Sequence, residues 1–405
     1  MKARLAFVLA LVLGAPGCGA EPGERSEAAE NPRFPSHRTE LPVGRHALAY
    51  VTNSVSDSVS VVDLDSMTVL ANVPIGLDPV DPDGPTDLAL DEAGGILYVV
   101  LSYPVPPSQG PHAAHHATAR HGFVEARALD DLHRLGSLEV DSSPAGIALA
   151  ADRSTLLVAH EDIDRAAQLG DNLEARRAAV WVVEPGTLLG TGPASARAVT
   201  VCAAPFAVAY AASDARAFVT CTGEDSVAVL DPADFAVPAR IPITVPRGGV
   251  TKPYAAAPDP ARQRLVVSST VSRAVTLIGM NDMAVVWTVA FDGTPGRPAG
   301  VPYFAAWTSD SELIVPVQSP DGIARLDAES GSVLAAPAYS ADDCSRPRQA
   351  VAGAGGRVFL VCEGDHFAPG KLVELDATTL AVTRSVALEL GPDRMAILPA
   401  RGSGS

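Results

Sequence analysis

The sequence has few aromatic residues, few cysteines and no apolar run long enough to cross a membrane permanently. Aromatic residues make up 5% of the 405 positions, and there are 5 cysteines. The apolar run at residues 5–13 is about half as long as a transmembrane helix. A Gly-x-Ser-x-Gly elbow, a phosphate loop, a Cys-x-x-Cys pair and a His-Glu-x-x-His helix are also missing. The sequence therefore argues against a polytopic membrane protein and against the enzymes that these motifs mark.

Basic residues are also scarce, since 30 lysines and arginines face 47 acids and the formal charge is −17. Such a chain is repelled by phosphate backbones and by anionic membrane surfaces, so we expect neither nucleic acid nor direct membrane binding. An exported protein or an envelope polymer remains open as the partner. We expect a monomer that touches a membrane only through an N-terminal lipid.

A five-residue phrase that begins with proline recurs along the chain. The seven prolines are Pro85, Pro144, Pro205, Pro253, Pro302, Pro347 and Pro392, at spacings of 59, 61, 48, 49, 45 and 45 residues. Periods of this size are typical of propellers and solenoids. Each phrase is followed by further short apolar runs separated by turn residues, and no long stretch has a helical period. This pattern predicts an all-β, seven-bladed β-propeller with four-stranded antiparallel blades.

The two ends of the repeat region predict how the ring closes. The first repeat starts at a second strand, residues 47–52, and the last phrase is an innermost strand that nothing follows. The C-terminal strand should therefore complete the N-terminal blade and remove the exposed sheet edges. The recurring acids Asp63, Asp231, Asp327 and Asp376 follow third strands and are predicted to be turn residues.

The N-terminus has the features of an export signal. Lys2 and Arg4 precede the apolar run, and small residues follow it. Cys18 after Gly17 resembles a bacterial lipoprotein acceptor site, so residues 1–18 are expected to be a lipoprotein-like signal; ordinary cleavage and a soluble periplasmic protein are the alternative. Residues 19–44 are predicted to form a disordered tether, residues 45–400 the propeller and residues 401–405 a disordered tail.

A family resemblance rests on the first repeat. Residues 50–53 read Tyr-Val-Thr-Asn, and the runs at 59–63 and 73–76 follow them. The chain from about residue 45 to residue 400 resembles the YVTN-type β-propeller proteins, which are named after this tetrapeptide. Members are secreted or surface proteins, and related rings serve lactonases and periplasmic redox enzymes. The resemblance implies the fold, and no catalytic residue transfers with it.

Four cysteines fall at equivalent places in two repeats. Cys202 and Cys344 each lie three residues before a phrase proline, and Cys221 and Cys362 each end a second strand. These points are neighbours in an antiparallel pair, so we predict disulfides between Cys202 and Cys221 and between Cys344 and Cys362. Buried free thiols are the alternative.

The same register places the long insertions on one side of the ring, which we call the top face. It carries the links into the innermost strands and the loops between second and third strands. Residues 103–121 hold several histidines, and two more lie at corresponding positions in other repeats; the set is His112, His115, His116, His121, His160 and His366. Imidazoles suit zinc or copper, but the spacing matches no standard site, so a solvated polar loop is the alternative. Otherwise no cofactor is expected.

A second candidate site surrounds the channel mouth. The positions after the phrase prolines and the incoming links carry aromatic and cationic residues; the candidates are Phe206, Arg247, Tyr254, Arg297, Tyr303, Arg348 and Arg394. Such groups suit an anionic or carbohydrate-like ligand or a peptide segment, unless they only pack between blades. The sequence thus favours a non-catalytic, lipid-anchored binding scaffold of the cell envelope. A metal-dependent periplasmic enzyme or electron-transfer partner is the alternative.

Overall fold

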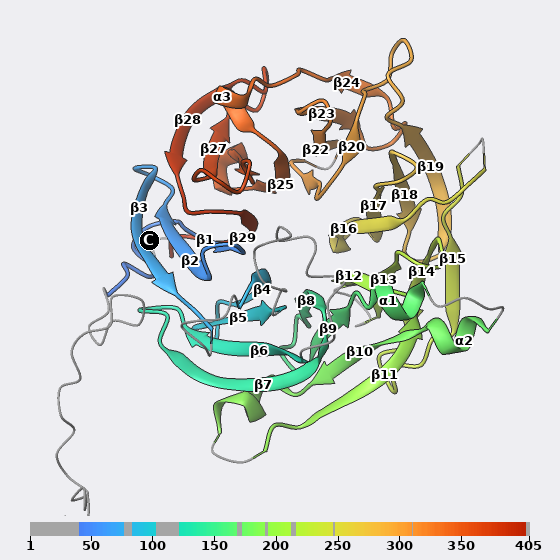
Figure 1. The fold of residues 1–405 in the computed structure, drawn as a ribbon. Coiled ribbons are helices and arrows are strands. Elements are labelled where there is room, and N and C mark those ends of the chain that lie inside the picture. Colours follow the sequence, from blue (N-terminus) through green and yellow to red (C-terminus); the bar gives the residue numbers. More distant parts are fainter. Residues whose placement is uncertain are drawn as a thin grey trace, which may run out of the picture. The chain divides into compact units, whose positions relative to one another are not determined.

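The innermost strands of seven antiparallel sheets meet around a common axis (Figure 1). The structure is a computed structural model that describes residues 40–76, 83–102, 121–167, 172–190, 193–211, 216–245, 248–309 and 311–401. Blade one consists of β29 (Pro392–Leu398), β1 (Leu48–Asn53), β2 (Ser58–Asp63) and β3 (Thr68–Pro74). Blade two consists of β4 (Pro85–Asp91), β5 (Ile96–Leu101), β6 (His121–Ala128) and β7 (Arg134–Ser142). Blade three consists of β8 (Pro144–Leu149), β9 (Leu156–His160), β10 (Ala178–Val183) and β11 (Ala196–Cys202).

The remaining blades repeat this order. Blade four consists of β12 (Pro205–Tyr210), β13 (Ala217–Cys221), β14 (Ser226–Leu230) and β15 (Ala239–Pro242). Blade five consists of β16 (Pro253–Asp259), β17 (Arg264–Ser269), β18 (Ala274–Gly279) and β19 (Ala284–Ala290). Blade six consists of β20 (Val301–Pro302), β21 (Ala306–Trp307), β22 (Glu312–Gln318), β23 (Gly322–Asp327) and β24 (Val333–Ala335). Blade seven consists of β25 (Pro347–Ala352), β26 (Val358–Cys362), β27 (Lys371–Leu375) and β28 (Val382–Ala387).

The predicted seven-bladed propeller is confirmed, and so is its closure. β29 pairs antiparallel with β1, with Leu398 opposite Leu48 and Met395 opposite Val51. The only described helices are short: α1 (Ile163–Ala166), α2 (Leu173–Arg176), α3 (Ala341–Cys344), η3 (Pro185–Leu189), η4 (Pro260–Arg262) and η5 (Ala354–Gly356). None of these helices could span a bilayer. The predicted turn residues are also confirmed, since Asp63, for example, accepts hydrogen bonds from two backbone N–H groups that follow it.

The residue before an innermost strand usually has a left-handed backbone. Its φ lies between 48° and 66° at Gly84, Ser143, Ala204, Lys252, Arg346 and Gly391. Its carbonyl accepts a hydrogen bond of 2.8–3.1 Å from the N–H of the residue that follows the second strand. We call these residues after the second strand the top ring: Ser54, Ser102, Glu161, Thr222, Thr270, Ser319 and Glu363. A left-handed residue other than glycine costs on the order of 1–2 kcal/mol, so these hydrogen bonds help to hold the links in place.

Blade six departs from the predicted repeat, because its innermost strand is interrupted. Tyr303 still donates a hydrogen bond to the carbonyl of Pro316 in β22, at 2.9 Å. Pro316 has no N–H and cannot return the bond, so the strand leaves the sheet at this point. Phe304 pairs with blade seven instead: its N–H donates to the carbonyl of Arg348 and its carbonyl accepts from Ala350, at 3.2 and 3.0 Å. A proline in a second strand thus moves Phe304 towards the axis.

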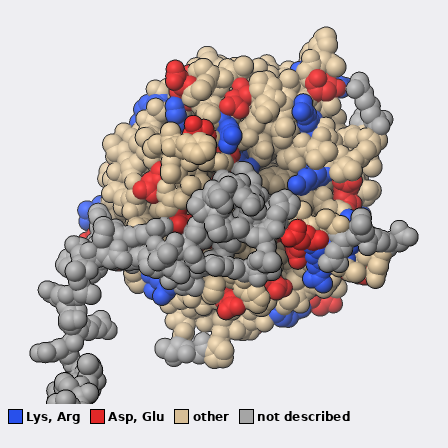
Figure 2. Space-filling view, viewed as in Figure 1, with Lys and Arg blue, Asp and Glu red and all other residues tan. Residues whose placement is uncertain are grey.

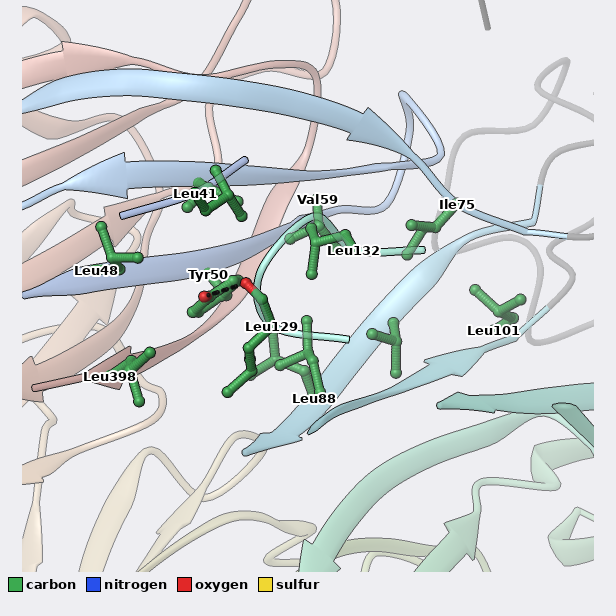
Figure 3. Packing of buried hydrophobic residues seen from close by; sticks show 13 residues of the cluster. Leu41, Leu48, Tyr50, Val59, Ile75, Leu88, Leu101, Leu129, Leu132 and Leu398 are labelled. Atoms are coloured by element: carbon green, nitrogen blue, oxygen red, sulfur yellow. Dashed lines mark hydrogen bonds between the residues drawn. The ribbon is translucent and has the colours of Figure 1, made fainter. Parts of the chain in front are cut away.

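The core lies between neighbouring blades, because both faces of each sheet are covered. Alternate residues of β1 point to opposite sides: Leu48 and Tyr50 pack with residues of blade two, and Ala49 and Val51 pack with residues of blade seven. Figure 3 shows the first of these layers, in which the Tyr50 hydroxyl donates a hydrogen bond of 2.9 Å to the Leu129 carbonyl. Leu41 belongs to the same layer and is 4% exposed. The segment expected to be tether therefore joins the fold by this residue.

Both predicted disulfides are present. Cys202 and Cys221 have a Cα–Cα distance of 5.7 Å, and Cys344 and Cys362 have one of 5.3 Å. Each bond links the segment that leads into an innermost strand to the end of the strand next to it. Cys202 ends β11 and Cys221 ends β13, whereas Cys344 ends α3 and Cys362 ends β26. Disulfides are typical of exported proteins, because the cytosol keeps thiols reduced.

Replacing both cysteines of one pair, Cys344→Ala with Cys362→Ala, should lower the free energy of unfolding by about 3 kcal/mol, because the unfolded chain regains the entropy of an open loop. Urea denaturation under non-reducing conditions measures this change. The Cys202→Ala, Cys221→Ala double variant is the matched comparison and should lose a similar amount. A loss of less than about 0.5 kcal/mol in both variants, or free thiols in the unreduced wild type, would contradict the pairing.

Candidate functional site

At least one of the two positions that follow each phrase proline faces the axis. Residues at one or both of these positions in every blade line a cavity of about 40 Å³, which we call the axial pocket. Every blade contributes to the lining. One lining residue from each, in order from blade one to blade seven, is Ser54, Asp87, Gly146, Phe206, Tyr254, Phe304 and Arg348. The pocket therefore depends on the closed ring rather than on any single blade.

Small residues precede the innermost strands of blades one and two. Gly391 and Gly84 precede the innermost strands of these blades, whereas Lys252 and Arg346 stand at the same place in blades five and seven. Gly84 lines the pocket together with the top-ring hydroxyl residues Ser54 and Ser102. Figure 2 shows acidic and basic side chains interspersed on one face of the ring, with no extended patch of one sign among the residues coloured by charge.

Arg348 is the central charge of the site. Its side chain is buried; Nε donates to Asp393 Oδ1 at 2.6 Å, and Nη2 donates to the Tyr254 hydroxyl at 3.0 Å. Its guanidinium also lies 4.9 Å from the centre of the Tyr303 ring. Burial alone would lower the pKa of Arg348, but the carboxylate of Asp393 raises that pKa well above its usual value. Arg348 therefore remains charged and holds Asp393 in a buried ion pair.

A second ion pair faces the same pocket. Arg394 Nε donates to Asp87 Oδ1 at 3.1 Å, and the Arg394 guanidinium lies 3.4 Å from the centre of the Phe304 ring. The Asp87 carboxylate also accepts from the backbone N–H groups of Leu88 and Ile147. Burial raises the pKa of Asp87, while Arg394 opposes the rise. Asp87 is thus a buried carboxyl group that holds its proton to higher pH than an ordinary aspartate.

Aromatic rings form the wall opposite blades one and two. Phe206 and Tyr254 are stacked with their ring centres 3.8 Å apart, and Phe304 lies 5.7 Å from Tyr254. Tyr303 meets Tyr254 edge to face at 6.0 Å, so it supports the wall from behind and does not line the pocket. Burial raises the pKa of Tyr254 far above its usual value, so its hydroxyl remains neutral.

Two members of the top ring are acids instead of hydroxyl residues. Glu161 is buried beside Lys252, with Oε1 and Nζ 3.9 Å apart, and Glu363 Oε1 lies 2.7 Å from His366 Nε2. Burial raises the pKa of Glu161 to about 7, although Lys252, Arg348 and a hydrogen bond with Thr222 act to lower it. Blades three and seven therefore add carboxyl groups near Arg348 where other blades carry serine or threonine.

The structure brings some of the predicted channel-mouth residues to the axial pocket and leaves others away from it. Phe206, Tyr254, Arg348 and Arg394 line the axial pocket. Arg297 lies elsewhere: its side chain is 51% exposed and pairs with Asp292 at 3.3 Å, because the loop that carries it folds back on itself between Gly293 and Pro298. Arg247 lies outside the described residues.

The described histidines do not gather at one place. His121 Nδ1 lies 2.7 Å from Glu139, and His366 pairs with Glu363. His160 is buried, its Nδ1 lies 3.3 Å from the Ala179 carbonyl, and burial lowers its pKa to about 4. Among the described residues, the groups of potential metal ligands contain none of these three; they are His46 with Asp63 and Asp65, and Asp130 with Asp131 and His133. His112, His115 and His116 lie outside the described residues, so the metal site stays a prediction.

Asp87 and Thr86 are pocket residues that the sequence reasoning passed over. The sequence did contain a signal for Asp87. It stands at the second position after the phrase proline, where most of the other phrases carry a small or aromatic residue. An acid at a position that lines the axial pocket in most repeats is an exception that calls for a ligand or an ion pair.

The Arg348→Met variant should lose about 3–5 kcal/mol of unfolding free energy, because Asp393 would remain buried without its partner. Thermal or urea unfolding measures the loss. Arg297→Met is the matched control, because Arg297 pairs with Asp292 while both side chains stay partly exposed, at 51% and 28%. That change should cost less than about 1 kcal/mol. Equal losses in the two variants would contradict a central role for Arg348.

Glu161 should make stability depend on pH. Its pKa is raised to about 7 in the folded protein, so its contribution to stability is complete below its unfolded pKa of about 4.3 and is lost as the pH rises through 7. The free energy of unfolding should therefore fall less between these pH values in the Glu161→Gln variant than in wild type. The variant should also be more stable than wild type at pH 8. Urea midpoints across this range measure the effect, with Glu92→Gln at an exposed acid as control. A wild-type slope retained in Glu161→Gln would refute the assignment.

Comparison with known proteins gives the fold and no family. No protein-family model and no curated protein sequence matches the chain. A protein from Lactobacillus plantarum is similar in structure, with a TM-score of 0.63 and 15% identity over 87% of this chain and 99% of that one. The periplasmic gluconolactonase PpgL of Pseudomonas aeruginosa has a TM-score of 0.61 and 15% identity over the same shares. A putative 6-phosphogluconolactonase from Bacteroides fragilis has a TM-score of 0.60 and 14% identity, over 87% and 98%. At these identities the likeness is one of propeller fold alone.

Proposed function

We propose that this protein is an exported β-propeller that binds an envelope polymer or another exported protein through its top face. One small polar group of that ligand would enter the axial pocket. The observation that carries the proposal is the pocket itself: two buried ion pairs and stacked aromatic rings converge there from six of the seven blades. Charges buried at this density are expensive unless they serve a specific structure or ligand.

The size of the pocket favours a macromolecular ligand over a free metabolite. A cavity of about 40 Å³ has room for roughly three water molecules, if each needs about 10–15 Å³ of this measure. That is the size of one side group or chain end, and is too small for a whole sugar or cofactor. The rest of such a ligand would then lie on the top face around the pocket.

Export is supported by the two disulfides and by the signal-like N-terminus. The lipoprotein-like Cys18 and the YVTN-type resemblance belong to the same proposal. A lipid at Cys18 would hold the ring at a membrane surface, while its acidic charge would keep the ring itself off anionic lipid.

Lactone hydrolysis is a second candidate, and one residue favours it. Asp87 is a buried carboxyl group with a raised pKa that lines the pocket, so it is suited to exchange a proton with a bound water or a leaving oxygen. Two of the structural neighbours are named as lactonases. Ring opening of glucono-1,5-lactone, followed with a pH indicator, separates the two candidates, because only the enzyme would lose turnover in Asp87→Asn.

The Ser102→Phe variant tests the binding proposal, because a phenyl ring at this lining position fills the pocket mouth without entering the blade core. Immobilised protein is exposed to separated fractions of envelope polymers and exported proteins. The wild-type protein should retain at least about tenfold more of one component than the Ser102→Phe variant does. This ratio corresponds to a difference of about 1.4 kcal/mol in binding free energy. Leu135→Glu, on the outer strand β7, should bind like wild type. Retention that the filled pocket leaves unchanged would exclude the axial pocket as the binding site.

A further inference from the structure

We propose that the group bound in the axial pocket is a neutral vicinal diol at the end of a carbohydrate chain. The inference rests on the proposed binding function of this pocket and names the chemistry of its ligand. It starts from two buried polar atoms in the pocket wall, Arg394 Nη1 and Thr86 Oγ1, which make no hydrogen bond with the described residues.

Buried polar atoms without a partner are rare, because each one forfeits a hydrogen bond that water would have supplied. Arg394 Nη1 can only donate, whereas Thr86 Oγ1 can donate and accept. An alcohol oxygen can accept from the first atom, and a neighbouring hydroxyl can satisfy the second. A pair of adjacent hydroxyls therefore matches both atoms and still has hydrogens to donate to the nearby aspartates. A carbonyl oxygen can accept from both atoms but has nothing to donate, and an ammonium group cannot accept from Arg394.

The charges of the pocket favour a neutral ligand. Asp87 is paired with Arg394 at 3.1 Å, and Asp393 is paired with Arg348 at 2.6 Å, so two acids and two bases already balance. An entering carboxylate or phosphate would lie against the two aspartates, and an entering amine would lie against the two arginines. Either ion would lose its hydration without gaining a net opposite charge.

Each ion pair also presents an acceptor and a donor side by side. A hydroxyl can donate to the aspartate oxygen and accept from the arginine at the same time, and such charge-assisted hydrogen bonds are stronger than neutral ones. The carbon side of a diol is apolar and fits the aromatic wall of Phe206, Tyr254 and Phe304. The volume of about 40 Å³ suits three or four heavy atoms, which is the size of a diol at a chain end.

The test is calorimetric titration with uncharged and charged sugars of similar shape. Cellobiose and maltose are the neutral probes, gluconate is the anionic probe and glucosamine is the cationic probe. We expect at least one neutral disaccharide to bind at least tenfold more tightly than gluconate or glucosamine. The longer chains cellopentaose and maltopentaose should bind at least as tightly, whereas tighter binding of free glucose than of any chain would contradict a chain-end ligand.

Thr86→Val keeps the shape of the side chain and removes only the hydroxyl, so it should weaken neutral-sugar binding about three- to tenfold with little change in melting temperature. Arg153→Met is the control, because Arg153 pairs with Asp91 and does not line the pocket, and it should bind like wild type. Tighter binding of gluconate or glucosamine that Ser102→Phe abolishes would overturn the diol and leave the pocket as the binding site. Binding of any sugar that neither Thr86→Val nor Ser102→Phe weakens, or no sugar binding at 10 mM of these probes, would overturn the inference.

Discussion

The hydrogen bonds between β29 and β1 hold the first and last strands of the propeller in one sheet, and every other feature of the site depends on them. Without this pairing β1 would offer an open edge, and blade one would have no innermost strand. Asp393 and Arg394 lie on β29, so the same pairing brings one member of each ion pair to the axis. Closure of the ring and assembly of the pocket are therefore one event.

The pocket arises where the repeats differ from one another. Gly84, which precedes the innermost strand of blade two, lines the pocket, whereas Lys252 and Arg346 at the same place in blades five and seven do not. Pro316 moves Phe304 out of its sheet and into the wall. Asp87 and Arg348 occupy positions at which most other blades carry small or aromatic side chains. A regular repeat builds the scaffold, and its exceptions build the site.

The fold was predictable from sequence because the signals that specify it are local and repeated. The proline phrase marked the innermost strands, the aspartates marked turns, and the cysteines confirmed the register. The site was only partly predictable. Phe206, Tyr254, Arg348 and Arg394 could be placed near the axis, since their positions after the proline are fixed by the strand.

The rest of the site depends on distances between blades, which no repeat pattern contains. That Arg348 pairs with Asp393, and Arg394 with Asp87, follows from the radius of the ring. The interruption of blade six needed the proline in β22 to be recognised as a missing donor. Arg297 was misplaced because its loop folds back upon itself before the strand begins.

The pairing of Phe304 with blade seven has a mechanical consequence. Two backbone hydrogen bonds join Phe304 of blade six to β25 of blade seven, a direct link between the backbones of adjacent blades. Blades six and seven should therefore yield to force or heat as one unit. Unfolding would then begin at an interface between two blades that is held by side-chain packing.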